Sequence, residues 1–308
     1  MVLERYRMNE SISKADMRGN LSEPYDALAK EYDKRYQSGY LPDLQNDIIF
    51  STLQEVIGTK RKRILDAGGG TGFYSLPLAA QGHEVVILDK SRNMLEVAEE
   101  KAKKLGAEAK IRTVVGDMEN IKEPNESFDV VVCHLALCHS RDPMVALKEF
   151  SRVLRRQGIL SLVTENKMFF SISEAFKGNL AEALKRYKEE HLTVAVSSLG
   201  NLRTFERKKL LGLLKQAGFE PVRVLGLRII SDYLSFAFKH PPADLEKLKE
   251  LEFLLGRSRE WNSIGRFHFT IARSERTDSR AGLSRNWCKM VIIPIFWFRD
   301  SFEVYMCF

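Results

Sequence analysis

Between residues 62 and 164, short apolar runs alternate with amphipathic stretches. This alternation is typical of strand–helix–strand units that build a parallel sheet. In the stretch 92–104, for example, Met94, Leu95 and Ala98 share one face of a helix. The pattern predicts an α/β core with strands at 63–67, 84–88, 111–115, 129–133 and 159–163, and helices at 71–80, 92–104 and 143–154.

The flanks of this core carry further elements. The stretch 44–56 is predicted to be an amphipathic helix that covers the mouth of the sheet. After Asn166, a lysine-rich helical stretch at 169–190 and a connector to Phe205 break the rhythm, which predicts a lid insertion at about 167–205. The remaining pattern predicts helices at 206–216 and 245–255 and strands at 221–230 and 266–272.

Three parts of the chain are therefore expected. Residues 1–20 are expected to be flexible, and residues 21–273 to form one domain that includes the lid insertion. The tail 274–308 shows neither helical nor strand periodicity and has no assigned element.

Composition and charge add a few exclusions. The chain has 308 residues and a formal charge of +7, which suits a polyanionic partner such as RNA and equally an ordinary solvated surface. Its four cysteines form no C-x-x-C pair and no metal-ligand spacing, so we expect neither a disulfide framework nor a metal site. The polar N-terminal residues resemble no secretory signal, and the longest apolar run, 290–298, is too short to span a bilayer. We expect a cytoplasmic protein.

The strongest chemical signal is the run Asp66-Ala67-Gly68-Gly69-Gly70-Thr71-Gly72, which joins a predicted strand to a predicted helix. Glycines in such a loop let the backbone approach a bound nucleoside, and free amides at a helix start favour anionic groups. Asp89 ends the next strand, where a carboxylate can accept both hydroxyls of a ribose. Together these residues predict a nucleoside ligand.

Two other nucleotide loops fit less well. A dinucleotide-binding loop normally has a small residue where Phe73 stands, because helix and strand pack closely there. A phosphate-cradling Walker loop needs Gly-Lys-Ser/Thr after its glycines, and the chain lacks it.

The run at 66–72 resembles motif I of the class I S-adenosylmethionine-dependent methyltransferases. Asp89 matches their acidic ribose ligand, and the Gly116-Asp117-Met118 loop resembles the one that meets the adenine amino group. The segment 152–160 resembles their R-V-L-x-x-G-G-x-L segment, with Gln157 in place of one glycine. The resemblance covers about residues 21–273. It implies a Rossmann-like, doubly wound, mostly parallel seven-stranded sheet with helices on both faces and a helical lid insertion.

The resemblance also implies a methyltransferase whose cofactor is S-adenosyl-L-methionine. The cofactor-binding residues that it implies are Asp66, Gly68, Gly69, Gly70, Gly72, Asp89, Lys90, Asp117, Met118, His134 and Tyr32. Structural roles stay open for some of them: Asp89 as a helix cap, although Ser91 is better placed, Asp117 as a turn residue and Tyr32 as a packing residue. Tyr32 belongs to a stretch from Tyr25-Asp26 to Tyr32-Asp33 that looks like the Y-D-x-x-A-x-x-Y-D lead-in of these enzymes.

The loop after the fourth strand bears on the methyl acceptor. It reads Cys133-His134-Leu135-Ala136-Leu137-Cys138-His139 and lacks the Asn/Asp-Pro-Pro-Tyr/Phe segment of enzymes that methylate exocyclic amines of nucleobases. We expect no DNA partner. His139 is a candidate general base, which a carbon, hydroxyl or amine acceptor needs and an ionised carboxylate does not.

A second resemblance lies beyond the core. The segments 226–234 and 264–273 look like the C-terminal half of bacterial enzymes that methyl-esterify 5-carboxymethoxyuridine at the tRNA wobble position. It implies tRNA as a partner and makes Arg228, Tyr233 and Arg266 candidates for gripping an anionic acceptor, because a guanidinium fork matches a carboxylate. Pairs that support the fold are the alternative. Gln45 departs from the family, which carries an arginine near the cofactor carboxylate at about that place.

The lysine-rich stretch has two interpretations as well. Its cations would suit RNA phosphates, with Phe169, Phe170 or Tyr187 available for base stacking. Interleaved glutamates such as Glu182 instead favour a solvated helix face with ion pairs.

The sequence thus favours a methyltransferase that acts on a carboxylate of a modified tRNA wobble uridine. The first alternative is a small-molecule methyltransferase resembling the ubiquinone/menaquinone C-methylating enzymes, which share the tyrosine–aspartate lead-in. The second is a catalytically silent methyltransferase-like binding subunit.

Overall fold

A computed structural model describes residues 23–36, 39–196, 200–237 and 244–275. The segment 1–20 and residues 276–308 of the unassigned tail lie outside the described residues. Within the described part, no helix combines the length and the apolar character that a membrane crossing requires.

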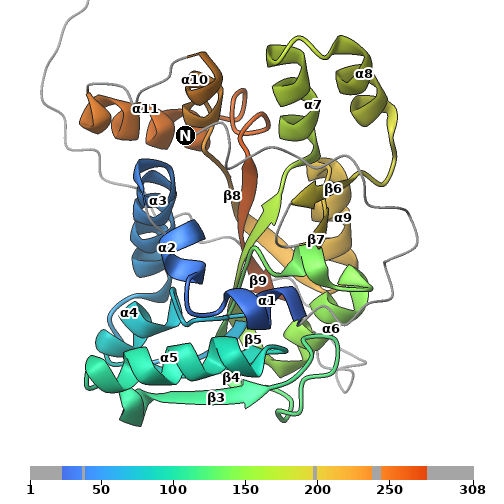
Figure 1. Cartoon of the computed structure of the whole chain (residues 1–308). Coiled ribbons are helices and arrows are strands. Elements are labelled where there is room, and N and C mark those ends of the chain that lie inside the picture. The colour runs from blue at the N-terminus through green and yellow to red at the C-terminus, as the bar shows by residue number, and fades with distance from the viewer. Residues whose placement is uncertain (1–22, 37–38, 197–199, 238–243, 276–308) are drawn as a thin grey trace, which may run out of the picture. The chain divides into compact units, whose positions relative to one another are not determined.

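Seven strands form one sheet in the order β3-β2-β1-β4-β5-β9-β8 (Figure 1). Only β9 runs antiparallel to its neighbours, and the other pairings in this sheet are parallel. The strands are β1 (Arg63–Ala67), β2 (Glu84–Asp89), β3 (Ile111–Val115), β4 (Phe128–His134), β5 (Leu154–Glu165), β8 (Phe219–Leu227) and β9 (Phe267–Ser274).

Helices cover both faces of the sheet because successive strand residues point to opposite sides. Ile64 and Val130 belong to the apolar layer under one set of helices, whereas their neighbours Leu65 and Val131 belong to the layer on the other face. The first set is α3 (Tyr40–Ile57), α4 (Ser75–Ala80) and α5 (Arg92–Lys104), and the second includes α6 (Pro143–Val153) and α9 (Arg207–Gln216). The predicted fold class is confirmed.

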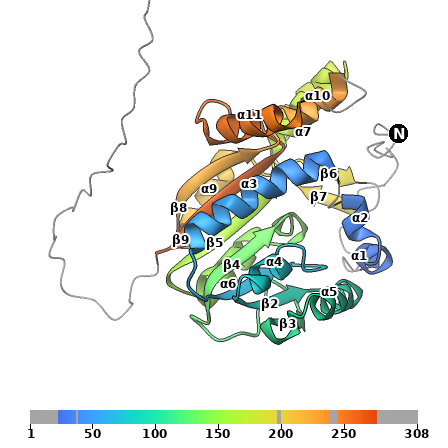
Figure 2. The ribbon, with the colours of Figure 1, turned by 90° about the vertical axis from the view of Figure 1, so that its left-hand side faces the viewer.

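The helix predicted at 44–56 is α3, but it does not cover the mouth of the sheet. It lies along one face of the sheet (Figure 2). Its Ile49 and Leu53 belong to the apolar layer on that face. The residues that precede it form two short helices, α1 (Glu23–Leu28) and α2 (Tyr32–Tyr36).

The glycine loop shortens the helix predicted at 71–80. Residues 70–74 lie in turns, and α4 begins only at Ser75. Gly72 adopts a φ of +73°, a left-handed conformation that interrupts a right-handed helix. The next helix, α5, begins as expected, because Ser91 caps it by accepting a hydrogen bond from the Met94 amide.

The stretch expected to form a lid insertion holds four elements between β5 and α9. The helical part is split at Gly178 into α7 (Lys167–Phe176) and α8 (Leu180–Lys188). The connector to Phe205, for which no strand was predicted, pairs β6 (Thr193–Val196) with β7 (Gly200–Arg203) in an antiparallel hairpin. Further on, α10 (Ser231–Ala237) was not predicted either, whereas α11 (Leu245–Arg257) matches the helix expected at 245–255.

Candidate functional site

A cavity of about 930 Å³, partly open to solvent, lies at the carboxyl ends of β1, β2 and β4. The strand order reverses between β1 and β4, and open α/β sheets bind ligands at such a point. All the predicted cofactor residues except Gly72 line this cavity: Tyr32, Asp66, Gly68, Gly69, Gly70, Asp89, Lys90, Asp117, Met118 and His134.

The glycine loop forms one wall of the cavity by close backbone approach. A Cβ on Gly68 would lie 2.3 Å from the Cβ of Ala136, so only glycine lets the loops after β1 and β4 meet. Gly72 faces away, and a Cβ there would lie 3.2 Å from Ile87 Cδ1. Gly72 therefore serves the packing of loop and sheet rather than the cavity surface.

Asp66 supports the loop from below. It is buried, and its Oδ2 accepts a hydrogen bond of 2.6 Å from Ser75 Oγ at the start of α4. Burial raises its pKa to about 7, with the hydroxyl of Ser75 opposing and Asp89 adding to the rise. Asp66 thus holds the turn between β1 and α4.

Asp89 ties two loops together at the cavity wall. Its Oδ2 accepts from the Gly70 amide at 2.9 Å, and its Oδ1 accepts from the Ser91 amide at 2.8 Å. Burial raises its pKa. Because a carboxylate has about four acceptor positions, Asp89 can still accept hydrogen bonds from a ligand. Ser91 caps α5, which removes that alternative for Asp89.

Lys90 and Asp117 form an ion pair of 2.9 Å across the ends of β2 and β3. Asp117 also accepts a hydrogen bond from the Glu119 amide, as a turn residue does. Although partial burial alone would raise the pKa of Asp117, the Glu119 amide and Lys90 hold it below its ordinary value. The residue therefore shapes a turn and lines the cavity as well.

The N-terminal tyrosine–aspartate repeat closes one side of the cavity. Tyr25 and Tyr32 both line it, with ring centroids 6.0 Å apart. Asp26 accepts a hydrogen bond from Ser91 Oγ, and Asp33 accepts from Thr71 Oγ1 and from Lys101 Nζ. In each pair the tyrosine faces the cavity and the aspartate is anchored to the core. Tyr25 was not among the predicted cofactor residues, although its motif was recognised.

Two histidines, one at the end of β4 and one in the loop that follows, face the cavity in neutral form. His134 Nε2 lies 2.8 Å from Ser161 Oγ, and burial lowers its pKa to about 3. His139 Nε2 lies 2.6 Å from the Tyr25 hydroxyl, and burial, with a smaller effect of Lys90, lowers its pKa to about 4. The neutral imidazole of His139 keeps a nitrogen lone pair at pH 7, but its lowered pKa makes it a weaker base than an ordinary histidine.

The other candidates, Arg228, Tyr233 and Arg266, do not line the cavity. They gather at the ends of β8 and β9, where Arg228 donates two hydrogen bonds of 2.5 Å to the two oxygens of Asp232. Arg266 Nη1 lies 3.5 Å from Asp232 Oδ1. The side chains of Arg228 and Asp232 are buried, and that of Arg266 is largely buried. Arg228 holds this place with a φ of +57°, in the left-handed region.

Aromatic rings complete this second cluster. The guanidinium of Arg266 lies 5.1 Å from the ring centroid of Phe169 and 5.2 Å from that of Phe267. Tyr233 donates a hydrogen bond to the Ile264 carbonyl and packs on Phe169. Phe169 and Phe170 are buried, so they are not available for base stacking as expected, whereas Tyr187 is exposed.

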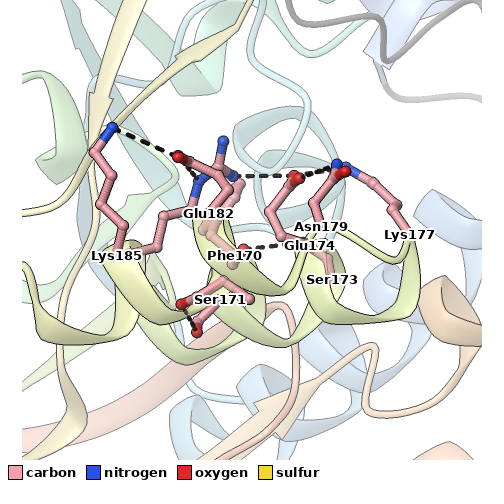
Figure 3. Close-up of polar contacts among 10 residues, drawn as sticks. Phe170, Ser171, Ser173, Glu174, Lys177, Asn179, Glu182 and Lys185 are labelled. Carbon is pink, nitrogen blue, oxygen red and sulfur yellow. Dashed lines mark hydrogen bonds and ion pairs between the residues drawn. The ribbon is translucent and has the colours of Figure 1, made fainter.

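Figure 3 shows how the cations of the lysine-rich stretch are paired. Glu174 of α7 accepts hydrogen bonds from Lys177, from Asn179 and from Arg186 of α8. Glu182 pairs with Lys185 and Arg186. These pairs support the interpretation of the lysine-rich stretch as a solvated helix face with ion pairs.

Sequence reasoning missed three buried carboxyl groups near the arginines: Asp232, Glu165, and Glu252, which accepts hydrogen bonds from the amides of residues 229–231. Asp232 of α10 follows Arg228 by four residues, and Glu165 is the last residue of β5. The sequence did carry one signal for Glu165, because it is a charged residue at the end of an apolar run that predicts a strand. Among the described residues, no group of three or more His, Cys, Asp or Glu side chains is arranged to hold a metal ion.

The cavity fits an adenosine-containing sulfonium cofactor. The glycine cradle leaves space that any Cβ would fill, and Asp89 stands at the end of β2 with acceptor positions to spare. Asp117 and Met118 line the cavity beyond β3, and Tyr25 and Tyr32 line it as well.

Comparisons with known proteins agree with this geometry. Residues 65–162 match the family described as "Methyltransferase domain". The tRNA 5-carboxymethoxyuridine methyltransferase of Escherichia coli (strain K12) is 25% identical over 264 residues, which is 83% of this chain and 98% of that protein. The demethylmenaquinone methyltransferase of Clavibacter sepedonicus is 32% identical over 142 residues, 46% of this chain and 56% of that protein.

Solved structures show the same fold. The crystal structure of an S-adenosylmethionine-dependent methyltransferase from Mesorhizobium loti superposes with a TM-score of 0.53 at 18% identity, covering 75% of this chain and 99% of that one. The chain therefore contains a class I S-adenosylmethionine-dependent methyltransferase domain, and S-adenosylmethionine is its cofactor.

Proposed function

We propose that the protein transfers the methyl group of S-adenosylmethionine to a carboxylate on a modified uridine at the tRNA wobble position. The observation that carries this proposal is the pair of arginines, Arg228 and Arg266, at strand ends on the cavity side of the sheet. The guanidinium fork is the side chain that matches a carboxylate. Similarity to the E. coli enzyme over nearly its full length supports the same acceptor.

The side chains suit such a reaction. The bound cofactor supplies an electrophilic methyl group, and an ionised carboxylate oxygen can take it without a general base. What the protein must supply is alignment and exclusion of water. Asp89, the Lys90–Asp117 pair and the two tyrosines would hold the cofactor, while Arg228 and Arg266 would orient the acceptor. The net charge of +7 is compatible with an RNA partner in the cytoplasm.

The test uses tRNA from an E. coli strain that lacks its own 5-carboxymethoxyuridine methyltransferase. Purified protein and S-adenosylmethionine are added, and the tRNA nucleosides are analysed by mass spectrometry. We expect the free carboxylate at the wobble uridine to become a methyl ester. Unmodified transcript and the Asp89→Ala variant serve as controls, and absence of the ester with wild-type protein would contradict the proposal.

A second candidate has one observation in its favour. The hydrogen-bonded Tyr25–His139 pair places a neutral imidazole in the cavity, and a base there serves a carbon, hydroxyl or amine acceptor. Such an acceptor would make the protein a small-molecule methyltransferase, as its similarity to the menaquinone enzyme suggests. A His139→Ala variant that still forms the tRNA ester at the wild-type rate would count against this candidate.

A further inference from the structure

Glu165 stands between the cofactor cavity and the two arginines. On one side, Val163 of β5 pairs with His134 of β4, and Glu165 lies two residues further, about 7 Å along the strand. On the other side, Glu165 pairs with Phe267, and Phe267 pairs with Leu227. Arg266 precedes Phe267 and Arg228 follows Leu227, so strand register alone brings both arginines to the same sheet edge as Glu165.

The carboxyl group of Glu165 is buried and incompletely bonded. The residue is 5% exposed, and its Oε2 accepts no hydrogen bond from any residue that the structure describes. Buried carboxyl oxygens are rarely left without a partner, because each costs desolvation free energy. This oxygen thus has capacity for a hydrogen bond that the described protein groups do not use.

The charged and titratable neighbours of Glu165 come from four places in the fold. Arg266 just before β9 and Arg228 just after β8 favour its ionised form, whereas Asp232 of α10 opposes it. Cys138 beyond β4 also faces it, and burial raises the pKa of that thiol, which keeps it neutral. Burial outweighs the arginines and raises the pKa of Glu165 to about 7. At neutral pH the carboxyl group is therefore poised between its two forms.

We propose that Glu165 is an acceptor-binding residue that must be protonated: its Oε2–H donates a hydrogen bond to the acceptor carboxylate, which Arg228 and Arg266 hold. This inference rests on the proposed function. An ionised Glu165 would place a second anion beside the acceptor in a poorly solvated site, and two such carboxylates do not both stay ionised.

The step conserves protons and charge. If Glu165 is ionised before the acceptor binds, its carboxylate takes up one proton from solvent as the acceptor binds. During transfer a carboxylate oxygen forms a C–O bond as the C–S bond of the sulfonium breaks, and the proton stays on Glu165. The neutral ester no longer attracts the arginines, so the product leaves and Glu165 can release its proton.

The experiment follows KM for carboxylate-bearing tRNA between pH 6 and pH 8, at saturating S-adenosylmethionine because Asp66 titrates in the same range. For wild type, KM should rise about tenfold across this window, since only the protonated form binds. Glu165→Gln keeps the size and a donor without a charge, so KM should stay at the low-pH value while kcat changes by less than about twofold. Glu165→Leu removes the donor and should raise KM at every pH.

Glu174→Gln is the matched control, because Glu174 is equally buried but already accepts from Lys177, Asn179 and Arg186 (Figure 3). It should keep the wild-type pH profile. Calorimetric S-adenosylmethionine binding checks that each variant is folded. If the ester forms but wild-type KM is flat, or Glu165→Gln keeps the wild-type slope, the role of Glu165 is refuted while the proposed function stands. If wild type forms no ester at any pH, the proposed function fails and this inference with it.

Discussion

The two halves of the sheet edge are built from different chemical groups. Around β1, β2 and β4 the backbone makes the site, through glycines and amides that approach the cavity, and Asp89 joins two loops there. Around β5, β9 and β8 buried side chains make it, with Arg228 and Arg266 stacked on aromatic rings and sharing Asp232. The first half depends on residues without a side chain, because a Cβ at Gly68 would meet Ala136, whereas the charge cluster depends on each buried charge having its partner.

The largest effect should therefore come from breaking the charge cluster. Arg228→Ala leaves Asp232 buried beside a single arginine, and loss of one partner of a buried ion pair costs about 3–5 kcal/mol of the free energy of unfolding. Chemical denaturation measures this loss. Arg223 is an exposed residue of β8, the strand that Arg228 follows, and pairs with Glu55, so Arg223→Ala should cost less than about 1 kcal/mol. Equal losses for the two variants would remove the contrast between the cluster and the surface.

A pH series should separate Glu165 from the paired glutamate of the insertion. The pKa of Glu165 rises from 4.5 to about 7 on folding, so its stabilisation is complete below pH 4.5 and is lost as the pH rises through 7. Relative to Glu165→Gln, wild type should lose at most about 3 kcal/mol of unfolding free energy between these pH values. Asp66 titrates in both proteins, so its contribution cancels.

The contribution of Glu174 to the free energy of unfolding should depend on pH with the opposite sign. Although burial alone would raise its pKa, hydrogen bonds from Asn179 and Lys177 lower it. Its stabilisation is therefore present above its ordinary pKa and lost only as the pH falls below that value. Relative to Glu174→Gln, wild type should be flat from pH 5 to pH 8, and a slope like that of Glu165 would show that the two carboxyl groups do not differ as described.

Around β1, β2 and β4, Asp89→Ala should weaken S-adenosylmethionine binding by about 1–3 kcal/mol, roughly 5- to 150-fold. The two loop amides lose their acceptor, and so do the two ribose hydroxyls if Asp89 has the predicted ribose role. Isothermal titration calorimetry measures the affinity. Glu96→Ala, in an exposed ion pair on α5, is the control and should bind normally. Unchanged affinity in Asp89→Ala would exclude the ribose role.

The smallest effect should come from the N-terminal cover. Asp33→Asn weakens a partly exposed ion pair with Lys101, worth at most about 1 kcal/mol. Because Asp33 anchors the segment that carries Tyr32, we expect S-adenosylmethionine to dissociate up to about fivefold faster, as measured by stopped-flow fluorescence. Lys30→Gln, an exposed residue between the two helices, should leave the rate unchanged. No change in either variant would show that the anchor does not control dissociation.

The contrast also explains what the sequence could reveal. The glycine loop and Asp89 predict a nucleoside site from their residues and spacing, and Asp117 was added by resemblance to the family. Of Asp66, the four glycines, Asp89 and Asp117, all but Gly72 line the cavity. Gly72 could not be told apart, because a glycine that serves helix–sheet packing looks the same in sequence as one that faces a ligand. The strands were predicted well because apolar runs decide them, while the short hairpin β6–β7 depends on pairing that no local pattern encodes.

The charge cluster was much harder to predict. Glu165 and Arg266 are 101 residues apart and meet only through the register of β5 with β9. Arg228 and Arg266 were recognised as candidates through resemblance, but Asp232 and Glu165, which set the charge around them, were not. Burial and register decide the properties of these groups, and neither can be read from single residues.

The left-handed backbone at Arg228 has a consequence for evolution. A non-glycine residue there costs about 1–3 kcal/mol, and replacing a buried ion pair by well-packed apolar groups is often neutral or stabilising. Selection for thermal stability alone would therefore be expected to discard Arg228 together with Asp232, for example as glycine and leucine. Under the proposed function, a chain that keeps both residues gives up some thermal stability for acceptor binding, and laboratory evolution of a thermostable form should lose activity first at these two positions.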